Sequence, residues 1–240
     1  MTKKKVTFRH EVKYFISHYQ YHCLKQRIKL LMRPDQHADK DGNYHLRSLY
    51  FDDMYNSALF EKLSGVLDRY KYRIRIYNHS DAVIKLEKKG KHNQFIFKQA
   101  QSIDRKQYES LLVNSNHSNK KLSDKKELLN EFLIIQKTQL LKPVIITDYV
   151  REAYVFKQGN VRVTFDKNLK LSYSNEDLFD KKSFTISACD QHLVIMEVKY
   201  EKFLPAFIKQ ALDGSHCARS AISKYAICRK FYKENPWEDQ

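Results

Sequence analysis

Charged and apolar positions alternate along several short stretches of the chain, most regularly at residues 69–77. Lys71, Arg73 and Arg75 take every second position there, and Tyr or Ile fills the positions between them. Successive side chains of a β-strand point to opposite faces, so this stretch predicts a strand with one cationic face and one core face. In an ordinary half-exposed sheet, the cationic face would simply meet water.

The same alternation recurs further along the chain, where the charged face carries both signs. Lys85, Glu87 and Lys89 share one face of a second stretch, and Glu197 and Lys199 share one face of a third. An antiparallel sheet that closed into a barrel with a polar interior would gather these rows around one lumen. A lumen lined mainly by Lys and Arg favours a polyanionic ligand.

Turn residues and helical spacing divide the rest of the chain into short elements. Ser17 and Gln20 form a capping-box pattern at the start of a helix that ends at Pro34, and the polar stretch 114–121 is too short to mark a domain boundary. Further strands are predicted at 8–16, 44–52, 83–89, 95–98, 144–156, 161–166, 185–187 and 194–200, and helices at 17–33, 55–63, 104–112, 123–142, 206–212 and 221–232. The pattern predicts one α+β domain over residues 1–240, an antiparallel closed β-barrel with flanking helices.

Composition adds a preference for an anionic partner. The 240 residues include 44 Lys and Arg against 28 Asp and Glu, which gives a formal net charge of +16. This charge favours nucleic acid, anionic lipid or a phosphate compound without choosing among them. The lysines at 3–5 are followed by no apolar run typical of a signal peptide, and no apolar segment reaches the roughly 18 residues of a spanning helix. We therefore expect a cytoplasmic location.

Eight short motifs follow one another along nearly the whole chain, and none of them is specific alone. They are Arg-x-Glu-x-Lys-Tyr at 9–14, Arg-Ser-Leu-Tyr-Phe-Asp at 47–52, Lys-x-Arg-x-Arg-x-Tyr at 71–77, Leu-Glu-Lys-Lys at 86–89, Tyr-x-Arg-x-x-Tyr at 149–154, Arg-Val-Thr-Phe-Asp at 162–166, Met-Glu-Val-Lys-Tyr at 196–200 and Ser-Lys-Tyr at 223–225. In this order they resemble the VTC domain, the polyphosphate polymerase domain of the triphosphate tunnel metalloenzyme (CYTH-like) superfamily. Arg9 stands where the wider superfamily has a Glu, which fits the VTC branch better than the thiamine-triphosphatase or adenylate-cyclase branch.

The resemblance implies a tunnel barrel of about eight antiparallel strands. Its basic interior would hold a nucleoside triphosphate, a triphosphate or an inorganic polyphosphate, with Mg²⁺ or Mn²⁺ bridging the phosphate oxygens. Larger members of the family carry membrane-spanning segments that this chain lacks. Coupling to a membrane would therefore need a separate partner.

Phosphoryl transfer needs cations on the non-bridging oxygens rather than a Ser, Cys or His nucleophile. Arg offers bidentate contacts and Lys a point charge. The candidate phosphate-binding residues are Lys13, Lys71, Arg73, Arg75, Lys85, Lys89, Arg151, Arg162, Lys199, Ser223 and Lys224. Those expected to act in catalysis are Lys71, Arg73, Arg75, Lys85, Arg151 and Lys199.

Carboxylates are the candidate metal ligands, because hard divalent ions take carboxylate and phosphate oxygens. Glu197 is the first candidate, and Glu11 and Glu87 come behind it. For each acid, the alternative is that it only neutralises neighbouring lysines in a crowded lumen.

Three functions stay open at this point. The first is a phosphotransferase that moves the γ-phosphoryl of a nucleoside triphosphate to the end of a polyphosphate chain. The second is hydrolysis of tripolyphosphate or a nucleoside triphosphate in the same tunnel, with water as the nucleophile. The third is a non-enzymatic module that binds nucleic acid, which the Tyr residues among the cations of 69–77 would support. Nucleic acid is disfavoured, because the cations are spread over many strands with acids among them.

Overall fold

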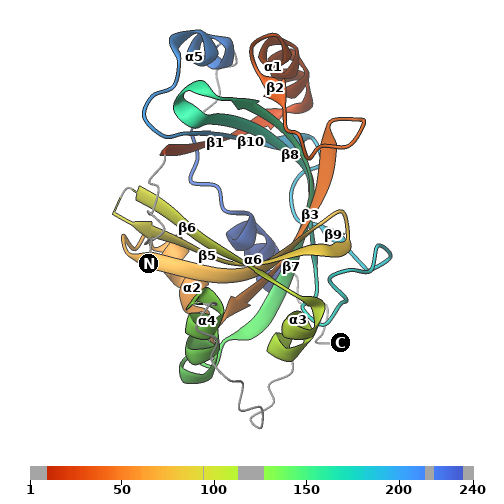
Figure 1. Ribbon diagram of the computed structural model, residues 1–240, viewed down its shortest axis with the longest axis vertical. Helices are drawn as coiled ribbons and strands as arrows, with labels where there is room; N and C mark the ends of the chain where they lie inside the picture. The colour runs from red at the N-terminus through yellow and green to blue at the C-terminus, as the bar shows by residue number, and fades with distance from the viewer. Residues whose placement is uncertain (1–9, 94, 113–126, 214–218, 235–240) are drawn as a thin grey trace.

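The protein is built around one antiparallel sheet that curls on itself (Figure 1). The computed structural model describes residues 10–93, 95–112, 127–213 and 219–234. The strands are β1 (His10–Ser17), β2 (Arg33–Pro34), β3 (Asn43–Asp52), β4 (Arg69–Tyr77), β5 (Ser80–His92), β6 (Phe95–Ile103), β7 (Lys142–Phe156), β8 (Val161–Ser172), β9 (Ile186–Ser187) and β10 (Leu193–Tyr200). The helices are α1 (His18–Leu31), α2 (Ser57–Leu63), α3 (Arg105–Leu112), α4 (Glu127–Thr138), α5 (Ala206–Asp213) and α6 (Lys224–Glu234), with a 3₁₀ turn η1 (Gln158–Asn160).

Eight strands form the continuous sheet, in the order β1, β10, β8, β7, β3, β4, β5 and β6. Its two edges, β1 and β6, come close together, but no backbone pairing joins them within the described residues. The free edge of β1 has another partner, since Tyr14 bridges to Arg219 and the Ser220 N–H donates to the Lys13 carbonyl at 3.0 Å. The expected closed barrel is therefore wrong for these residues. The sheet is curled and open, and residues 219–220 contact the backbone of Lys13 and Tyr14 on the β1 edge.

Among the described helices, α1, α3, α4 and α5 cover the outer face of the sheet, and α2 and α6 pack in the apolar cluster of the inner face. On the outside, α3 and α4 bury the apolar residues of β4 and β5, while α1 and α5 bury those of β8 and β10 (Figure 1). On the inside, Tyr225 of α6 packs with Tyr50 and Tyr149. None of the helices in the described part of the chain is both long and apolar enough to cross a membrane.

The observed elements follow the alternation and capping patterns closely. The Ser17 hydroxyl and the Gln20 side chain cap α1 reciprocally, and β4 has the predicted bounds. Several strands are longer than predicted, among them β6, which continues to Ile103, and β8, which continues to Ser172. Both extensions pair with a longer neighbouring strand, a partner that local sequence does not reveal. The starts of the helix predicted at 123–142 and of the strand predicted at 8–16, Arg9 included, lie outside the described residues.

Glu152 of β7 holds α1 against the outer face of the sheet. Its side chain is 2% exposed, accepts hydrogen bonds from the hydroxyls of Tyr21 and Tyr154, and pairs with Lys25 at 2.9 Å and Lys167 at 3.3 Å. Burial alone would raise the pKa of Glu152, but the hydrogen bonds from the two tyrosines and the lysines outweigh it and lower the pKa to about 2.

Glu152→Gln should lower the free energy of unfolding by about 1.5–3 kcal/mol near neutral pH, because charge-assisted hydrogen bonds to a buried carboxylate are lost. A lowered carboxyl pKa contributes stability above the ordinary value of 4.5, and that stability is lost as pH falls through about 2. Urea denaturation at a series of pH values should show the gap between parent and variant closing toward the acid end. A gap that does not change with pH would contradict this assignment.

Candidate functional site

The inner face of the sheet encloses a cavity of about 540 Å³. Cations from six strands line its wall: Arg73, Arg75, Lys85, Lys89, Lys98, Arg151, Arg162 and Lys199. Tyr44, Leu46 and Tyr77 line the part of the wall near the β4–β5 turn. This larger cavity is therefore cationic along most of its length, with an aromatic and apolar section at one end.

A smaller cavity of about 100 Å³ adjoins the larger one. The order of residues along β4 relates the two, since Arg69 and Lys71 border the smaller cavity, whereas Arg73 and Arg75 border the larger one. The smaller cavity is also lined by Lys13, Lys62, Lys91 and Ser223. Every candidate phosphate-binding residue except Lys224 thus borders one of the two cavities.

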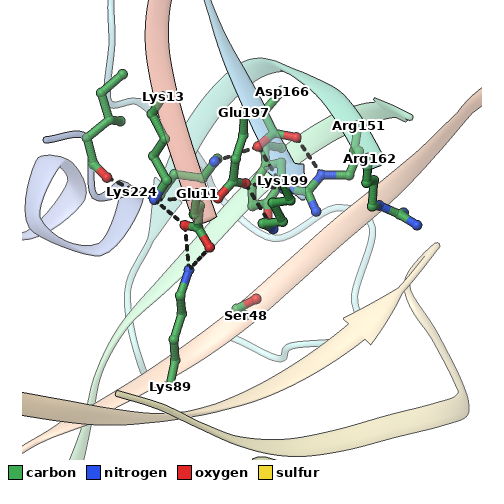
Figure 2. Close-up of polar contacts among 12 residues, drawn as sticks. Glu11, Lys13, Ser48, Lys89, Arg151, Arg162, Asp166, Glu197, Lys199 and Lys224 are labelled. Atoms are coloured by element: carbon green, nitrogen blue, oxygen red, sulfur yellow. Dashed lines mark hydrogen bonds and ion pairs between the residues drawn. The ribbon is translucent and has the colours of Figure 1, made fainter. Parts of the chain in front are cut away.

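Lys224, the first residue of α6, forms an ion pair with Asp166 of β8 on the inner face of the sheet (Figure 2). The Asp166 carboxylate accepts two hydrogen bonds from the Arg151 guanidinium, at 2.6 and 2.8 Å, and lies 2.5 Å from the Lys224 ammonium. Burial alone would raise the pKa of Asp166, but Arg151 and Lys224 outweigh it and lower the pKa to about 2. Asp166 therefore stays charged and fixes the direction of the Arg151 fork.

Glu11 and Glu197 extend from the neighbouring strands β1 and β10 and share their lysines (Figure 2). The Lys13 ammonium lies 2.9 Å from Glu11 and 3.6 Å from Glu197, and Lys199 lies 3.3 Å from Glu197. Burial opposes ionisation of Glu197, yet Lys199 and Lys13 hold its pKa well below the usual value. This corner of the cavity thus holds two charged carboxylates among lysines.

This corner is where a divalent ion fits best. Mg²⁺ and Mn²⁺ prefer oxygen ligands, and Mg²⁺ commonly keeps few protein ligands and takes the rest from phosphate and water. Among the described residues, no three His, Cys, Asp or Glu side chains form a ready-made metal site. Thr164, opposite Glu197 in the register, has a buried hydroxyl without a hydrogen-bond partner in the described structure, which leaves a polar position for a ligand or water. Glu197 and Glu11 therefore fit an ion shared with a phosphate ligand.

Glu87 belongs to a different group of contacts. Its carboxylate has no exposed side-chain surface, lies 2.6 Å from Arg73 and 4.0 Å from Arg75, and pairs with Lys98. Burial would raise the pKa of Glu87, but Arg73, Arg75 and Lys98 hold it well below the usual value. These contacts match the alternative stated for each acid, that it neutralises its neighbours, and a metal role for Glu87 stays a prediction.

Hydroxyl groups hold the arginines of β4 in place. Arg73 donates to the Tyr50 hydroxyl at 2.9 Å, and Arg75 donates to Ser48 and Tyr149 at 3.0 Å each. Because both guanidinium groups are oriented before any ligand arrives, little side-chain entropy would be lost on binding.

Lys71 borders the smaller cavity, and Arg162 borders the larger one. Lys71 donates to Ser223 at 3.2 Å and lies over the Tyr225 ring, so it is held by a hydroxyl and an aromatic face. Burial and the nearby Lys89 lower its pKa well below the usual value. Arg162 pairs with Asp35 and donates to Tyr44 at 2.7 Å.

Sequence reasoning missed Lys98 and Asp166 as site residues. Asp166 shares the face of Arg162 and Thr164 in a strand, and its alternation could have identified it. Lys98 lies opposite Lys89 in the β5–β6 register and reaches Glu87, and no local pattern reveals that register. No local pattern identifies Tyr50 and Tyr149 as the tyrosines that orient the arginines either.

Comparisons with known proteins agree with this architecture. A family model described as the VTC domain matches residues 8–233. No curated protein matches the chain. Among solved structures, a proposed adenylyl cyclase from Hippeastrum with a dominant triphosphatase activity has a TM-score of 0.53 at 15% identity, over 93% of this chain and 95% of that one. A proposed adenylate cyclase from Bacillus halodurans has a TM-score of 0.48 at 14% identity, over 98% and 96%. At 15% identity, the likeness to the Hippeastrum protein concerns the fold alone.

Glu87→Gln should lower the free energy of unfolding by about 3–5 kcal/mol, because it removes the charge that compensates buried Arg73, Arg75 and Lys98. Urea denaturation near neutral pH measures this loss. Glu109→Gln is the matched control, since Glu109 is 54% exposed and pairs with Arg105 in the same helix; it should change stability by about 0.5 kcal/mol or less. Equal small losses for the two variants would show that Glu87 does not hold the cations.

Proposed function

Because the chain belongs to the VTC domain family, we propose that it is a metal-dependent phosphotransferase of the polyphosphate polymerase type. It moves the γ-phosphoryl of a nucleoside triphosphate to the terminal phosphate of a polyphosphate chain. The terminal phosphate oxygen attacks the γ-phosphorus, and the bond to the nucleoside diphosphate breaks. The products are a nucleoside diphosphate and a chain longer by one phosphate.

The observation that carries this proposal is the continuation of the cationic interior beyond the larger cavity. A hydrolase needs room for one triphosphate and a water molecule. A polymerase also needs a cationic path for the growing chain, in line with the donor. Lys13, Lys71, Arg69 and Lys91 border such a continuation in the smaller cavity.

The arginines supply most of the stabilisation of the transition state. Charge in a loose phosphoryl-transfer transition state spreads over the non-bridging oxygens, where fixed cations stabilise it. Arg73, Arg75 and Arg151 are fixed by Tyr50, Tyr149 and Asp166. Lys85 and Lys199 add point charges on the same wall. Together these residues bind and orient the phosphates without a covalent intermediate.

Glu197, with Glu11, would hold Mg²⁺ or Mn²⁺ against the phosphates. A bound ion neutralises the charge that develops on bridging and non-bridging oxygens during transfer. Lys13 and Lys199 keep both carboxylates ionised and ready to bind. Glu197→Gln should therefore abolish metal-dependent turnover while the protein stays folded.

The rival functions differ from the proposal in their products and ligands. Hydrolysis would use the same residues, with water in place of the terminal phosphate. Nucleic acid receives less support, because the cations lie inside a curled sheet among Glu11, Glu87 and Glu197 rather than on an open patch. A cytoplasmic location and a separate membrane partner stay predictions.

Incubation with ATP and Mn²⁺ should yield ADP together with polyphosphate chains that lengthen over time. Gel electrophoresis of the polyphosphate and chromatography of the nucleotides measure the two products in one reaction. Release of orthophosphate without chain growth would contradict the phosphotransferase activity and favour hydrolysis. A reaction that forms neither ADP nor phosphate would contradict both enzyme functions.

Arg75→Ala should weaken tripolyphosphate binding by about 10- to 150-fold, because a charge-assisted contact in a desolvated site contributes about 1.5–3 kcal/mol. Titration calorimetry at two salt concentrations measures the change. Arg105→Ala is the control, since Arg105 is 39% exposed on α3, and it should bind like the parent. A loss at Arg75 that vanishes at moderate salt would point to a solvated cationic strand instead.

A further inference from the structure

An ion pair between Lys89 and Glu11 crosses the interior at the boundary between the two cavities. The Lys89 ammonium of β5 lies 2.8 and 3.1 Å from the two oxygens of Glu11 on β1. Figure 2 shows the Lys89 side chain extended from its strand across the interior to this carboxylate. The two strands are not sheet neighbours, so the contact depends on the side chains alone.

The position of this pair matches the division of the interior. Glu11 and Lys89 line both cavities, and Ile96 of β6 is the other residue that the two linings share. A chain of phosphates that passes from the larger cavity to the smaller one must therefore pass the Glu11 carboxylate. An anion at that point repels the ligand and also occupies the lysine that the ligand would use.

Glu11 has a second partner that lets the pair open. Its carboxylate also lies 2.9 Å from Lys13, which borders the smaller cavity. If a phosphate replaces Glu11 at Lys89, Glu11 keeps the contact with Lys13, and no buried charge is left without a partner. The exchange therefore replaces one ion pair with another.

We propose that the Glu11–Lys89 pair is a partition that makes ligand length a determinant of binding. Anions confined to the larger cavity bind with the pair intact. A longer polyphosphate enters the smaller cavity only when one of its phosphates displaces the Glu11 carboxylate from Lys89. This inference rests on the proposed function, because it takes phosphate chains as the ligands.

The test compares the affinities for tripolyphosphate and for a polyphosphate several times longer. Both are titrated calorimetrically in EDTA, so that metal binding by Glu11 plays no part. Glu11→Gln should raise the ratio of long-chain to tripolyphosphate affinity by about tenfold, which corresponds to about 1.4 kcal/mol. Glu11→Asp keeps the charge beside Lys13 but shortens the side chain, so it should preserve the fold and raise the ratio in the same direction.

Asp35→Asn is the matched control. Asp35 is a buried acid that lines the larger cavity and pairs with Arg162, away from the boundary. Its removal should strengthen the binding of both ligands to a similar extent and leave the ratio unchanged.

The outcomes separate this inference from the proposed function. If the parent protein does not bind tripolyphosphate, the proposed function is contradicted, and so is the partition that rests on it. If the parent binds both ligands and neither Glu11 variant changes the ratio, the partition is overturned and the proposed function stands. A ratio that rises equally in Asp35→Asn would also overturn it, because removal of any negative charge would then explain the effect.

Discussion

The burial of positive charge inside a curled sheet is the constraint on which the rest of the structure depends. Lysines and arginines taken out of water are stable only with partners. Glu87 forms ion pairs with Arg73, Arg75 and Lys98, and Asp166 forms one with Arg151. The cations named around the two cavities nevertheless outnumber the acids. These acids therefore neutralise the cations that they hold in place. The interior keeps an excess of positive charge, which an anionic ligand can neutralise.

Four of the inner carboxylates divide into two kinds by their contacts. Glu87 and Asp166 each hold arginines in place and are fully buried, so they behave as parts of the wall. Glu11 and Glu197 contact mainly lysines, which are point charges on flexible side chains rather than fixed arginine forks. The contacts therefore separate the carboxylates that hold arginines from the carboxylates that share lysines.

Much of this arrangement follows from local sequence, and the remainder depends on tertiary pairing. The alternation in β4 predicts that Arg73 and Arg75 share a face, because the two-residue period of a strand is a local property. That Glu87 lies opposite Arg73 depends on the β4–β5 register. The contacts on the edge of β1 come from residues 219–220, more than 200 positions away. Arg47 is the clearest case of a position that local sequence does not predict. This charged side chain is buried on the outer face of the sheet beside Asp148.

A crystal structure of the protein with tripolyphosphate and Mn²⁺ would test the central claim most directly. The phosphate chain should lie in the larger cavity, with its oxygens in hydrogen-bonding contact with Arg73, Arg75 and Arg151. The anomalous signal of the metal should lie beside Glu197. Phosphates bound on the outer face, or a metal bound at Glu87, would contradict the account.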